Sequence, residues 1–341
     1  SVGLTGISWT GTRLREALKI FRDIRIDNDL FLGWGLYPVG PVLGGFTFNP
    51  WLGCEKVSEA CKHCYAQAPA CGQMGYGNAE SKQVRKRLPV WGPAATTPRD
   101  RTSTANWRRP FAYNTLAESL GVRLKVFCGS LCDVGEDHPN VRLWRNDLFD
   151  LIERTPRLDW LLLTKRPEVL ADAWPWKRSV QRNVWAGVTA ESQRRAEGRV
   201  PHLLGINSIA HWLSCEPLFG DIELRPEWVK PRAFDHCPDE RQGDDDECRG
   251  CPGDPRAFGV GGDHCGAVWS PRVDWVIGGG GSGKAAEPPM DLGAFTRLAA
   301  QCERHGVAFY PKQDSGQKPG TPGRIPDALW AKKEWPERNW R

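Results

Sequence analysis

Seven short apolar segments of strand length recur along this chain of 341 residues and constrain its fold more than any other feature. They are apolar throughout rather than alternating, which indicates strands that are covered on both faces. Most neighbouring segments lie about 25 to 35 residues apart, and helical periodicity occupies 141–154 and 291–305. This rhythm predicts parallel βαβ units, and therefore an α/β protein built as a complete or partial (β/α) barrel. The predicted strands are 46–49, 125–130, 160–165, 184–189, 209–216, 274–279 and 307–313.

Polar and charged residues repeatedly follow these apolar segments. In (β/α) barrels the functional groups lie at the carboxyl ends of the strands, where such residues would gather. Some of them will only cap helices, but packing does not explain the whole pattern. The residues at the predicted strand ends are Asn49, Ser130, Asp133, Thr164, Lys165, Arg166, Thr189, Glu191, Glu216, Lys312 and Gln313.

Composition and segment boundaries predict four parts. We expect an N-terminal extension over 1–45, the first part of the barrel over 46–230, a Cys-rich insertion over 231–270, and barrel completion with a C-terminal tail over 271–341. No stretch approaches the roughly 18 consecutive apolar residues of a membrane span, and no basic-then-apolar leader is present, so we expect no membrane partner and a cytoplasmic location. The net charge of +5 permits anionic partners without requiring them.

Three of the twelve cysteines form a compact motif. Six residues separate Cys54 from Cys61, and two separate Cys61 from Cys64. A C-x-x-C pair can bring two thiolates to one metal site, and clustered cysteines in a reducing compartment more often bind metal than form disulfides. Three cysteines without an obvious fourth ligand suggest a [4Fe–4S] cluster with one open iron. A zinc site completed by His63 or a distant residue is the alternative.

A second group of cysteines lies in an acidic segment poor in apolar residues. Such a segment cannot bury enough surface to fold alone, and a metal site with four thiolates would stabilise it. Zinc and an auxiliary iron–sulfur cluster both fit, with a slight preference for zinc, and a disulfide pair is the simpler alternative. The four candidate metal ligands are Cys237, Cys248, Cys251 and Cys265.

A basic segment over 82–109 contains eight Lys and Arg residues against one acidic residue, interleaved with Trp91 and Trp107. Cations and aromatic rings in this combination suit a phosphate backbone with stacked bases. A solvated surface explains the segment equally well.

A glycine-rich segment over 278–284 matches the first seven positions of a phosphate-binding loop. Ala285 stands where the magnesium-binding hydroxyl belongs, and Pro288 and Pro289 obstruct the helix that should follow. These departures argue against nucleotide hydrolysis. Glycines at a strand end would also let the backbone approach a small ligand closely.

Several motifs together resemble the phage-associated three-cysteine-motif family, which is placed in the radical S-adenosylmethionine (SAM) superfamily. The similarity covers roughly 46–340 apart from the acidic insertion. It is carried by the segments Ile7–Thr10, Asn49–Cys54 with the two later cysteines, Leu163–Pro167, Trp185–Glu191, Ser214–Leu218, Trp275–Gly279 and Phe309–Gln313.

This resemblance implies a barrel of the radical SAM type in which Cys54, Cys61 and Cys64 hold a [4Fe–4S] cluster. The open iron would bind SAM, and an electron from an electron-donor partner would cleave it to a 5′-deoxyadenosyl radical. The chain departs from the common pattern at three points. Six rather than three residues separate the first two cysteines, His63 replaces an aromatic residue, and Gly280 replaces an acid.

The remaining candidate site residues all lie at predicted strand ends and form two sets, one for SAM and one for the substrate. We expect SAM contacts from Ser130, Thr189, Glu216, Gly278, Gly279 and Gly280. We expect Lys165, Arg166 and Lys312 to act on an anionic substrate, such as a nucleotide or a nucleic acid. The competing hypothesis is a non-enzymatic, zinc-dependent nucleic-acid-binding protein that uses both cysteine groups structurally.

Overall fold

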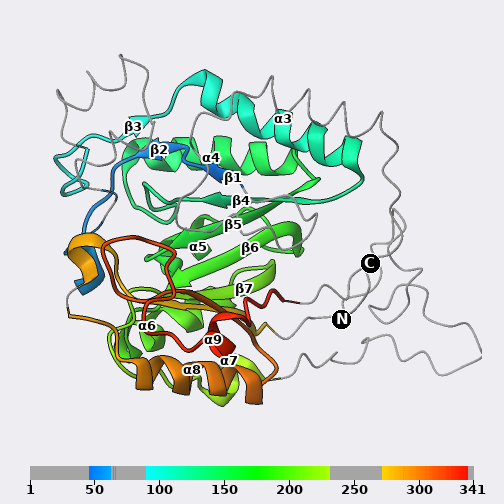
Figure 1. Ribbon diagram of the computed structural model, residues 1–341. Coiled ribbons are helices and arrows are strands. Elements are labelled where there is room, and N and C mark those ends of the chain that lie inside the picture. The colour runs from blue at the N-terminus through cyan, green and yellow to red at the C-terminus, as the bar shows by residue number, and fades with distance from the viewer. Residues whose placement is uncertain are drawn as a thin grey trace, which may run out of the picture.

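One parallel sheet of seven strands forms the centre of the molecule, with the strands in the order β1-β4-β5-β6-β7-β8-β9. Every neighbouring pair in this sheet is parallel. The sheet curls into a half-barrel with β1 and β9 at its two ends (Figure 1), so the partial form of the predicted barrel is confirmed. All seven predicted strands are present, as β1 (Phe46–Phe48), β4 (Leu124–Cys128), β5 (Leu158–Thr164), β6 (Gln181–Thr189), β7 (Ser208–Cys215), β8 (Val273–Gly279) and β9 (Ala308–Gln313).

The structure is a computed structural model that describes residues 46–62, 64, 66, 90–230, 271–286 and 288–336. The predicted N-terminal extension over 1–45 lies outside the described residues. So does the predicted metal-binding insertion over 231–270, with Cys237, Cys248, Cys251 and Cys265. Both stay predictions.

Helices cover the outer face of the curled sheet (Figure 1). The two helices expected from periodicity are confirmed as α4 and α8, and α8 begins where the Asp291 side chain accepts from Gly293 N. Its chain reverses at Gly306, with φ at 60°. No described helix is long and apolar enough to cross a bilayer. The helices are α3 (Thr104–Leu120), α4 (Pro139–Glu153), α5 (Pro167–Ala173), α6 (Gln193–Leu204), α7 (Pro226–Val229), α8 (Leu292–Arg304) and α9 (Asp327–Trp330), with short 3₁₀ helices η1 (Glu59–Cys61) and η4 (Gly283–Ala286).

The inner face of the half-barrel has an aromatic end and a polar end. On β6, Val184, Ala186 and Val188 pack outward in the large core beneath the helices. Between them Trp185 belongs to a second, inner cluster, whereas Thr189 at the end of the strand lines a pocket. Strand β7 repeats this order, with Trp212 in the inner cluster and Ser214 at the pocket. Because side chains alternate with a period of two, the indole and the hydroxyl on each of these strands lie on the same inner face. The indole comes earlier along the parallel strand, so the indoles lie toward the amino end and the hydroxyls at the carboxyl end.

The chain after α9 closes the amino end of the inner face. Trp275 Nε1 donates to the Glu334 carbonyl at 2.9 Å, and the Trp335 ring lies 4.5 Å from the Trp275 ring. The ammonium of Lys125, on β4, lies 4.5 Å from the Trp335 ring centroid. This packing leaves the carboxyl end as the polar end of the half-barrel.

We expect the substitution Gly187→Ala to test this packing. A Cβ at Gly187 would lie 2.1 Å from the Trp212 ring, so the indole must move within a closely packed core. We expect a loss of about 3 kcal/mol or more in the free energy of unfolding, measured by urea denaturation. Gly198→Ala on exposed α6, where a Cβ meets nothing within 4 Å, is the matched control and should stabilise by about 0.5–1 kcal/mol. Equal effects at the two sites would contradict the packing described.

Candidate functional site

A pocket at the carboxyl ends of the strands gathers residues from distant parts of the chain. The space between its lining residues is about 1030 Å³, open solvent at its mouth included. Of the residues predicted as metal ligands or as SAM or substrate contacts, the structure brings eight to its lining: Cys54, Cys61, Cys64, Ser130, Lys165, Thr189, Glu216 and Lys312. Asp133 and Thr164, predicted at strand ends, line it too.

The segment that carries Cys54 is fixed by a short antiparallel pair and a glycine. Strand β2 (Trp51–Leu52) pairs with β3 (Asp100–Arg101), and Gly53 follows with φ at 103°, a conformation that favours glycine. A Cβ at Gly53 would lie 2.1 Å from the carbonyl oxygen of Val90, so a larger residue could not pack here. Gly53 N also donates to the Leu131 carbonyl at 3.2 Å, which places Cys54 beside the loop after β4.

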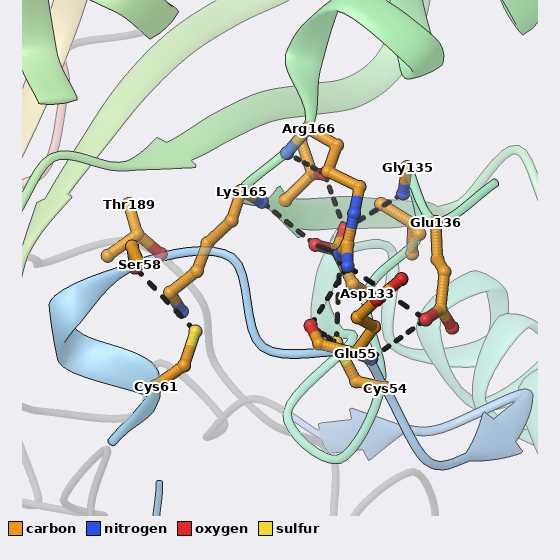
Figure 2. A network of polar contacts seen from close by, with 12 residues as sticks. Cys54, Glu55, Ser58, Cys61, Asp133, Gly135, Glu136, Lys165, Arg166 and Thr189 are labelled. Carbon is orange, nitrogen blue, oxygen red and sulfur yellow. Dashed lines mark hydrogen bonds and ion pairs between the residues drawn. The ribbon is translucent and has the colours of Figure 1, made fainter. Parts of the chain in front are cut away.

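A buried ion pair at the end of β5 faces the same cysteine. Arg166 Nη1 lies 2.6 Å from Asp133 Oδ2 and 3.7 Å from Cys54 Sγ, and Arg166 Nη2 donates to the Glu55 carbonyl at 2.9 Å (Figure 2). Burial opposes the ionisation of Asp133, but the charge of Arg166 and donors from Thr164 and Gly135 outweigh it, so the pKa of this carboxyl lies below its usual value. The end of β5 is therefore tied to the cysteine loop.

A second buried ion pair supports the loop from behind. Arg99 Nη2 lies 2.7 Å from Glu136 Oε1, and both side chains are almost fully buried. The same oxygen accepts from the backbone nitrogen of Glu55 at 2.8 Å. Arg99 also donates to the carbonyls of Gly92 and Thr97, so its guanidinium holds together the loop that borders the pocket.

Cys61 lies at the end of η1 in a different electrostatic setting. Burial raises the pKa of its thiol, but the positive charge of Lys165 and hydrogen bonds from the backbone of Val57 and from Ser58 outweigh burial. Its pKa is therefore below the ordinary value for a thiol. Burial likewise opposes protonation of Lys165, yet the charges of Cys61 and Cys64 raise its pKa.

Cys54 shows the opposite behaviour. Burial, with the negative charge of Asp133, raises the pKa of its thiol to about 12, although the charge and hydrogen bond of Arg166 act against this rise. Without a bound metal, Cys54 therefore stays protonated at neutral pH, whereas Cys61 ionises at a lower pH than an ordinary thiol.

Two further pairs link strand ends at the two sides of the sheet. Lys312 Nζ lies 2.7 Å from Glu216 Oε2, which joins the ends of β7 and β9. Asn49 Nδ2 donates to Ser130 Oγ at 2.9 Å and so links the ends of β1 and β4. The charge of Lys312 is thus already paired with a carboxylate, a restriction on its predicted role toward an anionic substrate.

The structure does not bring three of the predicted SAM contacts to the pocket lining. Gly278, Gly279 and Gly280 lie just before the residues that do line it, Gly281 and Ser282. A Cβ on Gly278 would instead meet the rings of Phe295 and Phe309 in the outer core. Gly278 therefore permits close packing between the sheet and α8. The part of the glycine-rich segment that borders the pocket is Gly281 and Ser282.

Sequence reasoning missed several residues of the site. Cys132 lines the pocket, but burial, with the negative charge of Asp133, raises the pKa of its thiol well above the ordinary value, so it stays neutral. Ser214 and Ser282 also line the pocket. Periodicity identifies an inward position such as Ser214, whereas the spacing of Cys132 carries no signal.

The three motif cysteines could hold an iron–sulfur cluster, because all three border one pocket. Among the described residues, no three Cys, His, Asp or Glu side chains are grouped as ligands of a single metal ion. His63, the ligand considered for a zinc site, lies outside the described residues. In a four-iron cluster each cysteine binds a different iron, so its ligands need not meet at one point.

The fold and the site define the class of this protein as an α/β half-barrel with a pocket at the carboxyl ends of its strands. The chain belongs to a family of proteins of unknown function (DUF5131), which matches residues 44–332 and therefore most of its length. No curated protein and no solved structure matches the chain.

We expect the thiols of Cys61 and Cys54 to ionise in different pH ranges in the metal-free, reduced protein. Because the thiolate is the reactive form, alkylation of Cys61 by iodoacetamide should level off at a lower pH than that of an ordinary thiol, while that of Cys54 should still rise at about pH 10. Mass spectrometry of the labelled peptides gives both pH profiles.

The variant Lys165→Gln tests whether the charge of Lys165 lowers the pKa of Cys61. Removing this charge should move the pH profile of Cys61 alkylation to higher pH. Profiles of Cys61 and Cys54 with the same midpoint would contradict the electrostatics described.

Proposed function

We propose that this protein is a radical SAM enzyme that binds a [4Fe–4S] cluster through Cys54, Cys61 and Cys64 and binds SAM in the adjoining pocket. The observation that carries this proposal is the convergence of the three cysteines with strand-end residues on one pocket. These residues come from the ends of six different strands and from the cysteine loop. Such convergence at the carboxyl end of a barrel is typical of an active site.

The chemistry of the donor set supports the same cofactor. Iron–sulfur clusters are held by thiolates, and the cations Lys165 and Arg166 offset the negative charge that three thiolates bring into a buried site. When bound, such a cluster would supply the electron that cleaves SAM to the 5′-deoxyadenosyl radical. The work of the chain is to bind, orient and shield the reactants.

The inner face of the half-barrel suits this shielding role. Trp185, Trp212 and Trp275 fill its amino end, and Trp335 from the C-terminal segment covers them. Ligands therefore meet polar groups only at the carboxyl end, where Thr189 and Ser214 line the pocket. A site closed on one side by apolar rings limits the access of water to a reactive intermediate.

The substrate we propose is anionic, a nucleotide or a nucleic acid. The basic segment offers limited support, because Arg99 is buried in its ion pair with Glu136 and Arg101 pairs with Asp147 at 2.5 Å. Two of its cations thus serve the fold. The same pairing weakens the alternative of a zinc-dependent nucleic-acid-binding protein that would use this segment for contact.

Anaerobic reconstitution with iron and sulfide, followed by SAM and dithionite, tests the proposal. We expect formation of 5′-deoxyadenosine, measured by liquid chromatography, and we expect Cys61→Ala to reduce it to the background of the metal-free protein. Cys302→Ala is the matched control, because Cys302 is buried in the outer core on α8, away from the pocket, and its loss should leave product formation unchanged.

Two results would contradict the proposal. One is a colourless wild-type protein that retains zinc but no iron. The other is undiminished 5′-deoxyadenosine from Cys61→Ala.

A further inference from the structure

We infer that Lys165 and Arg166, adjacent at the end of β5, serve the three cysteines rather than an anionic substrate. Arg166 is a positioning residue that orients Cys54, and Lys165 supplies positive charge beside Cys61 and Cys64. This inference rests on the proposed function, since it assigns both residues to the cluster that the cysteines would hold.

The contacts of Arg166 leave its guanidinium committed to the cysteine loop. It pairs with Asp133 at 2.6 Å, donates to the Glu55 carbonyl at 2.9 Å and lies 3.7 Å from Cys54 Sγ. Its side chain is only 9% exposed. A planar guanidinium can hold these three groups at fixed angles, which an ammonium cannot do. An anionic substrate would have to displace Asp133, a carboxylate that is itself held by Thr164 and Gly135.

The side chain of Lys165 points away from that of Arg166 at the end of β5. Figure 2 shows its side chain extending toward Cys61, while Arg166 lies beside Cys54 and Asp133. Lys165 is half-buried and lines the pocket, and its charge interacts with Cys61 and Cys64. Consecutive residues at the end of a strand point to opposite sides, so two cations adjacent in sequence reach different cysteines.

The position of Lys165 has a consequence for reduction. Three thiolates and a [4Fe–4S] core carry a net negative charge, and one electron from a one-electron donor makes that charge more negative. A positive charge beside two of the thiolates favours the reduced form, and the partly buried setting reduces screening by solvent. Lys165 therefore raises the midpoint potential and makes the site easier to reduce.

The test of Lys165 compares Lys165→Gln with Lys165→Arg in reconstituted full-length protein. We expect both variants to bind iron at the wild-type ratio. We expect Lys165→Gln to shift the midpoint potential to a more negative value, and Lys165→Arg to keep it near that of the wild type. The potential is measured by redox titration with dithionite, followed by electron paramagnetic resonance (EPR).

The test of Arg166 uses Arg166→Lys, which keeps a positive charge opposite Asp133 and so protects the fold. It loses the planar fork, and we expect a severalfold faster loss of iron to a chelator such as bathophenanthroline. Arg297→Lys is the matched control, since Arg297 pairs with Asp221 on the surface at 2.7 Å and should lose iron at the wild-type rate.

The outcomes separate this inference from the proposed function. A wild-type protein that binds no cluster overturns the proposed function, and this inference with it. A wild-type protein that binds its cluster, together with an unchanged potential in Lys165→Gln and an unchanged rate of iron loss in Arg166→Lys, overturns this inference alone.

Discussion

The buried ion pair between Asp133 and Arg166 is the interaction on which the rest of the site depends. It joins the loop after β4 to the end of β5, and through the carbonyl of Glu55 it fixes the cysteine loop to the half-barrel. Removing one partner of a buried pair typically costs about 3–5 kcal/mol, because the other charge is left without compensation. The pair is therefore poorly suited to exchange with a substrate, and it holds Cys54 in place before any ligand arrives.

The half-barrel divides its inner face between two kinds of side chain. Alternation on β6 and β7 places Trp185 and Trp212 toward the amino end and Thr189 and Ser214 toward the carboxyl end. The aromatic end fills space that a complete barrel would enclose, and the polar end forms the pocket. One structural rule, the period of two along a strand, thus separates the stabilising part of the interior from the part that could bind a ligand.

Sequence reasoning predicted the architecture well, because continuous apolar runs and the polar residues after them are local signals. It located all seven strands and ten of the residues that line the pocket. It could not separate the possible roles of the glycines at 278–280, since a glycine needed for packing against Phe295, as Gly278 is, looks the same in sequence as one needed for a ligand. It also assigned Arg166 to substrate, because the ion partner Asp133 and the thiol of Cys54 are brought to it only by the fold.

The central claim is that the sulfurs of Cys54, Cys61 and Cys64 hold one four-iron cluster with an iron open to SAM. EPR spectroscopy of the dithionite-reduced, reconstituted protein, recorded before and after addition of SAM, tests it most directly. The account predicts the signal of a reduced [4Fe–4S] cluster whose shape changes when SAM binds. A cluster signal that SAM leaves unaltered, or a reconstituted protein with no cluster signal, would contradict it.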